Sequence, residues 1–169
     1  MVCGDSRTGE TAKYDGIYYL INYLLRMPRW VSRFNIGNRE VSLNLVPIDF
    51  VVEAMIALAR DERAIGKTIQ LADPNPLTTH ELFNAIAQTI YGRVSTVTFP
   101  APIVQFFLSL PVTPPISRLP LHAVPYFFLR QSYDTALASE LLGPQGVSCP
   151  PFSSYVSEIV DFAATHRQL

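Results

Sequence analysis

The sequence predicts an α/β fold, because apolar runs suited to strands alternate with runs that have the spacing of amphipathic helices. The first apolar run, at Val2 and Cys3, leads directly into a loop rich in turn-forming residues, Gly4 to Gly9. No earlier run stands beside it as a candidate neighbouring strand. We therefore expect the 169 residues to form a single portion, the later part, of a larger α/β unit.

The first elements follow from spacing and from helix-ending residues. A helix is expected over Tyr14–Arg26, with apolar residues every three or four positions, and Pro28 ends it. Two strands are expected next, at Phe34–Gly37 and Val41–Ile48. Asp49 is then expected to cap a helix that runs to Arg60. Its apolar residues share one face, which consists of Val52, Met55, Ile56 and Ala59.

The next helix has the strongest start signal in the chain. Thr78 and Glu81 have the spacing of a capping box, in which each side chain bonds the backbone N–H of the other residue. Leu77 and Leu82 flank this pair at the two positions of a hydrophobic staple. Gly92 is expected to end the helix.

Four more elements are predicted around this helix. Strands are expected at Lys67–Ala72 and Val94–Phe99, and helices at Tyr133–Leu142 and Ser153–His166. On the last helix, one apolar stripe is formed by Tyr155, Ile159, Phe162 and Ala163.

The segment Val94–Tyr133 is unusually apolar and contains seven of the fourteen prolines. Its only charged residues are Arg118 and Arg130. Such a segment packs in a core, forms an apolar wall for a substrate, or contacts a membrane or partner. The prolines leave no uninterrupted apolar run long enough for a transmembrane segment. A substrate wall would be formed by Phe106, Phe107, Leu108, Tyr126, Phe127 and Phe128.

Charge and cysteine content exclude several function classes. The formal charge of -1 and the pI near 6.3, without a run of Lys or Arg, give no reason to expect nucleic-acid binding. The three histidines are widely spaced, so no metal site is expected. Cys3 and Cys149 form no metal-binding or redox motif, and we expect free thiols in a cytoplasmic protein.

Three motifs together resemble one enzyme family. They are Val2-Cys-Gly-Asp-Ser-Arg-Thr-Gly9, Lys13-Tyr-Asp-Gly-Ile-Tyr-Tyr19 and Asn44-Leu-Val-Pro-Ile-Asp-Phe-Val-Val-Glu-Ala54. The chain resembles the thioester-reductase-like, or male-sterility-domain-like, branch of the extended short-chain dehydrogenase/reductases. The resemblance implies the C-terminal part of a Rossmann-like fold, with the last sheet strands and the smaller mixed α/β substrate-binding domain. The N-terminal dinucleotide-binding portion of the family is not matched.

The family resemblance also implies site residues. In such relatives the first strand passes the nicotinamide of NAD(P), and this assigns cofactor contacts to Val2, Cys3 and Gly4. The loop that follows borders the substrate, which assigns substrate contacts to Asp5, Ser6, Arg7 and Thr8, with Tyr126 and Phe127 on the apolar wall. Related nucleotide-sugar epimerases hold a diphosphate with an arginine where this chain has Ser42. An acyl or other apolar substrate is therefore favoured.

Two catalytic signatures of the family are missing from the sequence. The eight glycines never have the Gly-x-Gly-x-x-Gly spacing of a dinucleotide-binding turn. The residues four positions before Lys13 and Lys67 are Gly9 and Arg63, so no Tyr-x-x-x-Lys pair exists. We expect no catalytic residue here and a chain that is inactive alone, with the missing N-terminal half of the enzyme as partner. The alternatives are a ligand-binding remnant without catalysis and a protein that associates with lipid surfaces.

Overall fold

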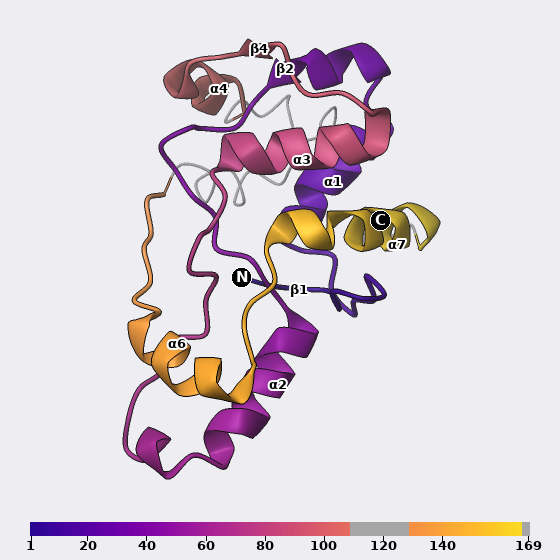
Figure 1. Cartoon of the computed structure of the whole chain (residues 1–169). Coiled ribbons are helices and arrows are strands. Elements are labelled where there is room, and N and C mark those ends of the chain that lie inside the picture. Colours follow the sequence, from indigo (N-terminus) through magenta and orange to yellow (C-terminus); the bar gives the residue numbers. More distant parts are fainter. Residues whose placement is uncertain (109–128, 167–169) are drawn as a thin grey trace.

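The helices of the protein lie in two groups on either side of a short pair of parallel strands (Figure 1). The structure, a computed structural model, describes residues 1–108 and 129–166. The strand pair consists of β1 (Val2–Cys3) and β3 (Val46–Pro47), with Val2 opposite Val46 and Cys3 opposite Pro47. This mixed α/β arrangement agrees with the predicted fold class.

The first group contains three helices that pack against one another: α1 (Ile17–Arg26), α3 (Thr79–Tyr91) and α7 (Val156–Thr165). Two short 3-10 helices, η1 (Arg29–Arg33) and η5 (Phe152–Ser154), flank this group. The core between the helices is closed. Its largest fully buried side chains include Tyr18, Tyr155, Phe83, Phe152, Leu20, Ile21, Leu24 and Ile86.

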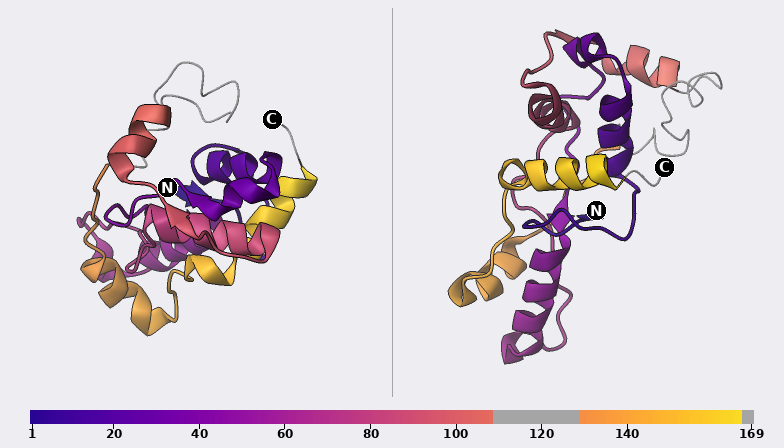
Figure 2. Two further views of the ribbon diagram at one scale, coloured as in Figure 1. Left: turned by 90° about the horizontal axis from the view of Figure 1, so that it is seen from above. Right: turned by 90° about the vertical axis from the view of Figure 1, so that its right-hand side faces the viewer.

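The second group contains α2 (Ile48–Ala59) and α6 (Ala136–Leu142). The 3-10 turns η2 (Glu62–Ala64) and η4 (Gly143–Gln145) follow these two helices. A separate, smaller core joins the group, with Phe50, Ala54 and Ala57 of α2 against Ala138 and Leu142 of α6. The side view in Figure 2 shows α2 and α6 extending away from the first group.

A second parallel pair covers the far end of the first group. It is formed by β2 (Phe34–Asn35) and β4 (Val97–Thr98), and α4 (Ala101–Leu108) follows β4. Three aromatic rings are in contact across this end, because Trp30 and Phe34 form a T-shaped pair and Phe34 stacks on Phe99. No described helix is both long enough and apolar enough to cross a membrane.

The predicted start of α3 is confirmed. The Thr78 hydroxyl accepts the Glu81 N–H at 3.2 Å, and the Thr78 N–H donates to the Glu81 carboxylate at 2.8 Å. Leu77 and Leu82 pack in the same core, and Gly92 ends the helix as expected.

Several predicted boundaries are wrong, and local geometry explains two of them. The first helix starts at Ile17 and not at Tyr14, because Gly16 has φ 60° and ψ -114°, outside the helical region. Asp49 is not an N-cap, since α2 already begins at Ile48 with Pro47 before it. The Asp49 carboxylate instead bonds Ser6, as described below.

The apolar face expected on α2 exists, but it is the exposed face. Val52, Met55 and Ile56 are 47%, 61% and 48% exposed. The face that packs inside consists of Phe50, Ala54 and Ala57. Both sides of α2 are thus apolar, a pattern usual for helices that are covered all round.

The strands are shorter than expected. Of the predicted runs, only Val2–Cys3, Phe34–Asn35, Val46–Pro47 and Val97–Thr98 pair with another described strand. Lys67–Ala72 forms no strand in the described part of the chain, and Ile69 and Leu71 pack on the smaller core instead. Strand structure requires a neighbour to accept and donate the backbone hydrogen bonds, and no described strand lies beside this run.

Candidate functional site

The polar loop after β1 is held in one shape by its own hydrogen bonds. The Asp5 N–H donates to the Glu10 carbonyl at 3.0 Å, and the Gly9 N–H donates to the Asp5 carbonyl at 2.8 Å. The Asp5 carboxylate also accepts the N–H groups of Arg7 and Thr8, at 2.8 and 3.1 Å. The loop therefore presents the exposed Arg7 and Thr8 side chains from a fixed backbone.

Ser6 joins this loop to the first turn of α2. The Asp49 carboxylate accepts the Ser6 N–H at 2.9 Å and the Ser6 hydroxyl at 2.5 Å. Partial burial raises the pKa of the Asp49 carboxyl, but the two bonds from Ser6, together with its own backbone N–H and the charge of Arg7, bring the net pKa below its ordinary value. The carboxylate is ionised at neutral pH and locks the loop to α2.

The residues assigned to the cofactor differ in accessibility. Val2 is 49% exposed, whereas Cys3 and Gly4 are buried. The Gly4 N–H donates to the Tyr18 hydroxyl at 3.0 Å, and a Cβ at Gly4 would lie 2.5 Å from the Gly9 carbonyl oxygen. Only glycine fits there, because the loop closes directly over it. The cofactor role of all three residues stays a prediction.

The two thiols near this strand are poor nucleophiles. Burial raises the pKa of Cys3 to about 11 and that of Cys149 to about 12. The Cys3 thiol lies 3.4 Å from the Val46 carbonyl oxygen and 3.9 Å from the Tyr155 hydroxyl, whose pKa burial also raises. Both cysteines are free thiols that stay protonated at neutral pH.

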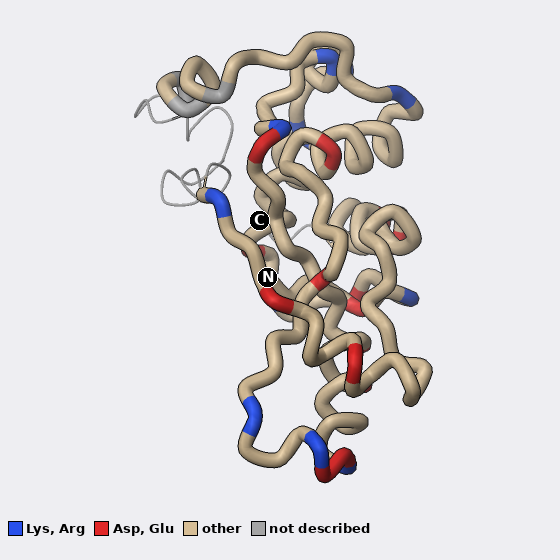
Figure 3. The backbone as a smooth tube through the Cα atoms, turned by 60° about the vertical axis from the view of Figure 1, so that its left-hand side comes forward, with Lys and Arg blue, Asp and Glu red and all other residues tan. Residues whose placement is uncertain are grey.

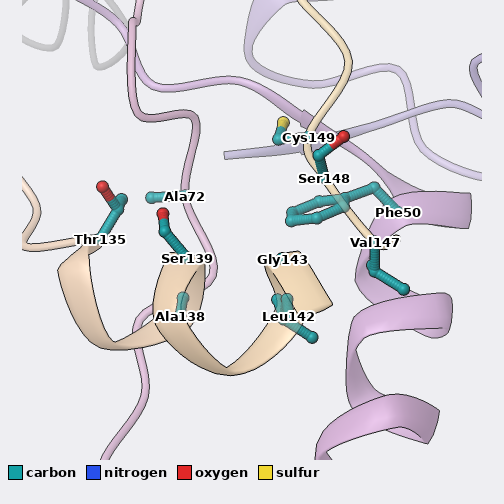
Figure 4. A pocket seen from close by; sticks show the side chains of 10 residues that line it. All are labelled: Phe50, Ala72, Thr135, Ala138, Ser139, Leu142, Gly143, Val147, Ser148 and Cys149. Carbon is teal, nitrogen blue, oxygen red and sulfur yellow. The ribbon is translucent and has the colours of Figure 1, made fainter. Parts of the chain in front are cut away.

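A small pocket of about 140 Å³ lies between α2 and α6 (Figure 4). The Phe50 ring extends across it from α2, and Cys149 lies above the ring in that view. The hydroxyls of Thr135, Ser139 and Ser148 are the other polar groups among its lining side chains. No charged residue lines this pocket, so it has the chemistry for a small apolar group and not for a phosphate.

A larger hollow of about 510 Å³ lies beside the second strand pair. One side is apolar and is formed by Phe99, Pro100 and Pro102, and the opposite side carries the polar segment 37–40. At this polar side Glu40 forms an ion pair with Arg130. The pKa of His80 is lowered by burial and by the nearby positive charge of Arg39.

The predicted substrate residues are not collected in this hollow. None of Asp5 to Thr8 lines it, and Tyr126 and Phe127 lie outside the described residues. Sequence reasoning missed Asn38, Arg39 and Glu40, which form the polar side. The only signal for them was a short polar run between two apolar runs, which is also typical of any surface loop.

The described part of the apolar segment Val94–Tyr133 is mostly open to solvent. Val94, Phe99, Ile103 and Phe106 are 53%, 41%, 47% and 64% exposed, while Val104 is buried. Phe106 belongs to the predicted wall, whose members Tyr126, Phe127 and Phe128 lie outside the described residues. Of these exposed residues, Phe99 lines the hollow.

Charged residues of both signs are interspersed along the described chain (Figure 3). Within residues 1–108 and 129–166, no three His, Cys, Asp or Glu side chains are grouped so that they could hold a metal ion.

One solved structure shares the fold over nearly the whole chain. It is the terminal R domain from the myxalamid PKS-NRPS biosynthetic pathway, with a TM-score of 0.72 and 21% sequence identity. The match covers 99% of this chain and 42% of that chain, so this chain spans less than half of its length. No family model and no curated protein matches the sequence. At the level of the fold, the match confirms the predicted resemblance to part of a thioester-reductase-like domain.

Proposed function

We propose that this chain is the substrate-binding part of an NAD(P)-dependent reductase of the extended short-chain type, acting on an acyl thioester or another apolar carbonyl compound. The observation that carries the proposal is the fold match to a terminal R domain over 99% of the chain. The three sequence motifs also support it, since they resemble motifs of the thioester-reductase-like branch.

The hollow beside β4 supports an apolar substrate. Its apolar side is formed by Phe99, Pro100 and Pro102, and its polar side includes Arg39 and Glu40. Sites for small organic ligands are usually apolar cavities with a few polar groups that fix orientation. A volume of about 510 Å³ is within the range of such sites and leaves room for a medium-length acyl chain.

This chain fits a nicotinamide cofactor only as one wall of its site. Val2 presents its side chain to solvent, while the Cys3 thiol and Gly4 face the protein interior. When bound, NAD(P)H supplies the hydride for reduction. The contribution of this chain is to position Val2 and the backbone of β1, and the Ser6 to Asp49 link holds the following loop in place.

The proposed enzyme has a second part and lies in a reducing compartment. The N-terminal half of the enzyme is the partner that supplies the glycine-rich turn and the Tyr-x-x-x-Lys pair, and the chain alone is inactive. The two free thiols suit a cytoplasmic protein.

Trp30 provides the test, because it is the single tryptophan and contacts Phe34, which stacks on Phe99. The 169-residue chain is titrated with the octanoyl and acetyl thioesters of N-acetylcysteamine and with a nucleotide sugar. We expect saturable quenching of Trp30 by the octanoyl thioester alone, and its loss in Phe99→Ala. Saturable binding of the nucleotide sugar, or no binding of the octanoyl thioester, would contradict an apolar acyl substrate.

Calorimetry tests the cofactor half of the proposal. Titration of the 169-residue chain with NADH and with NADPH is expected to show no tight binding, and added thioester is expected to cause no oxidation of either cofactor. Micromolar affinity for either cofactor would show that this chain forms a complete dinucleotide site by itself.

A further inference from the structure

The outer face of α2 is an apolar surface that nothing in the described chain covers. It consists of Ile48, Val52, Met55, Ile56 and Ala59, all of them exposed. These positions are spaced as i, i+4, i+7, i+8 and i+11, so they form one continuous stripe on the helix. The opposite face of α2 is already occupied by α6. An apolar stripe of this length on a free surface marks a contact site.

The stripe begins beside the strand pair of β1 and β3. Ile48, its first residue, donates its N–H to the Gly4 carbonyl at 3.4 Å, directly after β1. β1 pairs with β3 on one side, and no other described strand lies on its second side. Val2, on this strand, is 49% exposed. Parallel sheets in proteins usually contain more than two strands and are covered on both faces, so the open edge of β1 beside an apolar helix face is a position where a further strand can add.

From these features we infer that the outer face of α2 and the free edge of β1 form one docking surface for an α/β segment that adds a parallel strand beside β1 and covers α2. This inference rests on the proposed function, since the occupant is the remaining part of the reductase. The length of the solved relative supports it, because this chain matches only 42% of that chain.

Two other occupants fit the surface less well. A second copy of this chain related by a twofold axis would set its β1 antiparallel to the first, whereas the existing pair is parallel. A lipid surface favours helices with Lys and Arg beside the apolar stripe, whereas the charged residues of α2 are Asp49 and Glu53.

A photo-crosslinking amino acid at position 55 tests the surface. The 169-residue chain carrying it in place of Met55 is co-expressed with the polypeptide encoded directly before Met1, and a second variant carries it in place of Val94. Val94 is a matched control, since it is 53% exposed and lies between α3 and β4, at the opposite end of the molecule from α2 (Figure 1). We expect crosslinks to the preceding polypeptide from position 55 and none from position 94.

Substitution gives the second readout. Met55→Glu is expected to weaken the complex at least tenfold, and Val94→Glu is expected to leave its affinity unchanged, with circular dichroism showing that both variants are folded. Crosslinks between two copies of this chain, equal weakening by both substitutions, or the lack of any complex with a preceding polypeptide would overturn the inference.

Turnover separates this inference from the proposed function. If the complex crosslinks at position 55 but does not oxidise NAD(P)H with an acyl thioester, the docking surface is supported and the proposed function is contradicted. An active complex without the crosslink keeps the function and overturns the docking surface.

Discussion

The two helix groups differ in how they use their apolar residues. Each helix of the α1, α3 and α7 group packs its apolar face against the other two, and Ile17, Ile21 and Phe83 have no exposed surface. In the other group, α2 buries Phe50, Ala54 and Ala57 and leaves a second apolar face open. The difference indicates that the stability of the chain is concentrated in the first group. The open face of the second group belongs to the proposed docking surface.

Truncation in the closed core is expected to have the largest effect. Phe83→Ala removes a fully buried ring from the contact of α3 with α1 and α7, and should lower the free energy of unfolding by about 3–5 kcal/mol. Met55→Ala on the open face of α2 should change it by less than about 0.5 kcal/mol. Urea denaturation measures both values. If both variants lost a similar amount of unfolding free energy, the two helix groups would contribute equally to stability.

The link between the groups is the next target. Asp49→Asn weakens the charged hydrogen bonds from Ser6 and should cost about 1.5–3 kcal/mol. Because the folded-state pKa of Asp49 is depressed, its contribution is present above the unfolded-state pKa and is lost as pH falls through the folded-state pKa. Urea midpoints from pH 7 down to pH 3 should therefore fall more steeply in the wild type than in Asp49→Asn.

Glu53→Gln serves as the control for this pair, since Glu53 is an exposed carboxylate on the same helix. It should leave both the stability at pH 7 and the acid dependence unchanged. If Glu53→Gln changed the stability as much as Asp49→Asn does, the overall charge of α2 and not the bond to Ser6 would be the cause.

The cap of α3 should contribute less. Thr78→Ala removes the side chain that accepts the Glu81 N–H, and should cost about 1 kcal/mol. Thr89→Ala, later on the same helix, removes only a hydroxyl bonded to the Ala85 carbonyl and should stay within about 0.5 kcal/mol. Thermal or urea unfolding of both variants measures the difference. A larger loss in Thr89→Ala would contradict the importance of the capping box.

Replacing the thiols should have the smallest effect on stability, because they make no pH-dependent contribution at neutral pH. Their folded-state pKa values, about 11 for Cys3 and about 12 for Cys149, are raised above the ordinary value. Stability from this source is fully present below the unfolded-state pKa and declines as pH rises toward the folded-state values. Urea midpoints should therefore fall above about pH 9, and less so in Cys149→Ala. Rapid labelling of both thiols in the native chain at pH 8 would contradict this burial.

Local signals in the sequence were reliable, and long-range ones were not. The start and end of α3 were predicted correctly because the residues that fix them, from Leu77 to Gly92, are neighbours in sequence. Asp49 was assigned as a cap because its type suits that role, but its partner Ser6 lies 43 positions away. For α2, the prediction that Val52, Met55, Ile56 and Ala59 share a face is correct, but nothing in the sequence indicated that this face is the exposed one. Amphipathic spacing shows that residues share a face, and on a helix with two apolar faces it does not show which one is packed.

The candidate site was predictable to a similar extent. The loop from Asp5 to Thr8 lies at the end of β1 as the motif predicts. Its substrate role remains a prediction, and so does the cofactor role of Val2, Cys3 and Gly4. The hollow beside β4 was missed, because it brings segment 37–40 against Phe99 and Pro102, about sixty positions away. A contact at this separation leaves no trace in local spacing.

Asn35 joins the short pair of β2 and β4 to α3 through hydrogen bonds. These bonds restrict which residues can replace it in homologous sequences. Its amide is fully buried and donates to the His80 carbonyl, to Asn84 and to Ser95, while its oxygen accepts the Gly37 N–H. Leucine at this position would leave those groups without a partner, and aspartate would place a negative charge against two acceptor oxygens. Positions 35, 84 and 95 are therefore expected to change together among homologues, as an epistatic set in which single replacements are disfavoured and compensated combinations are allowed.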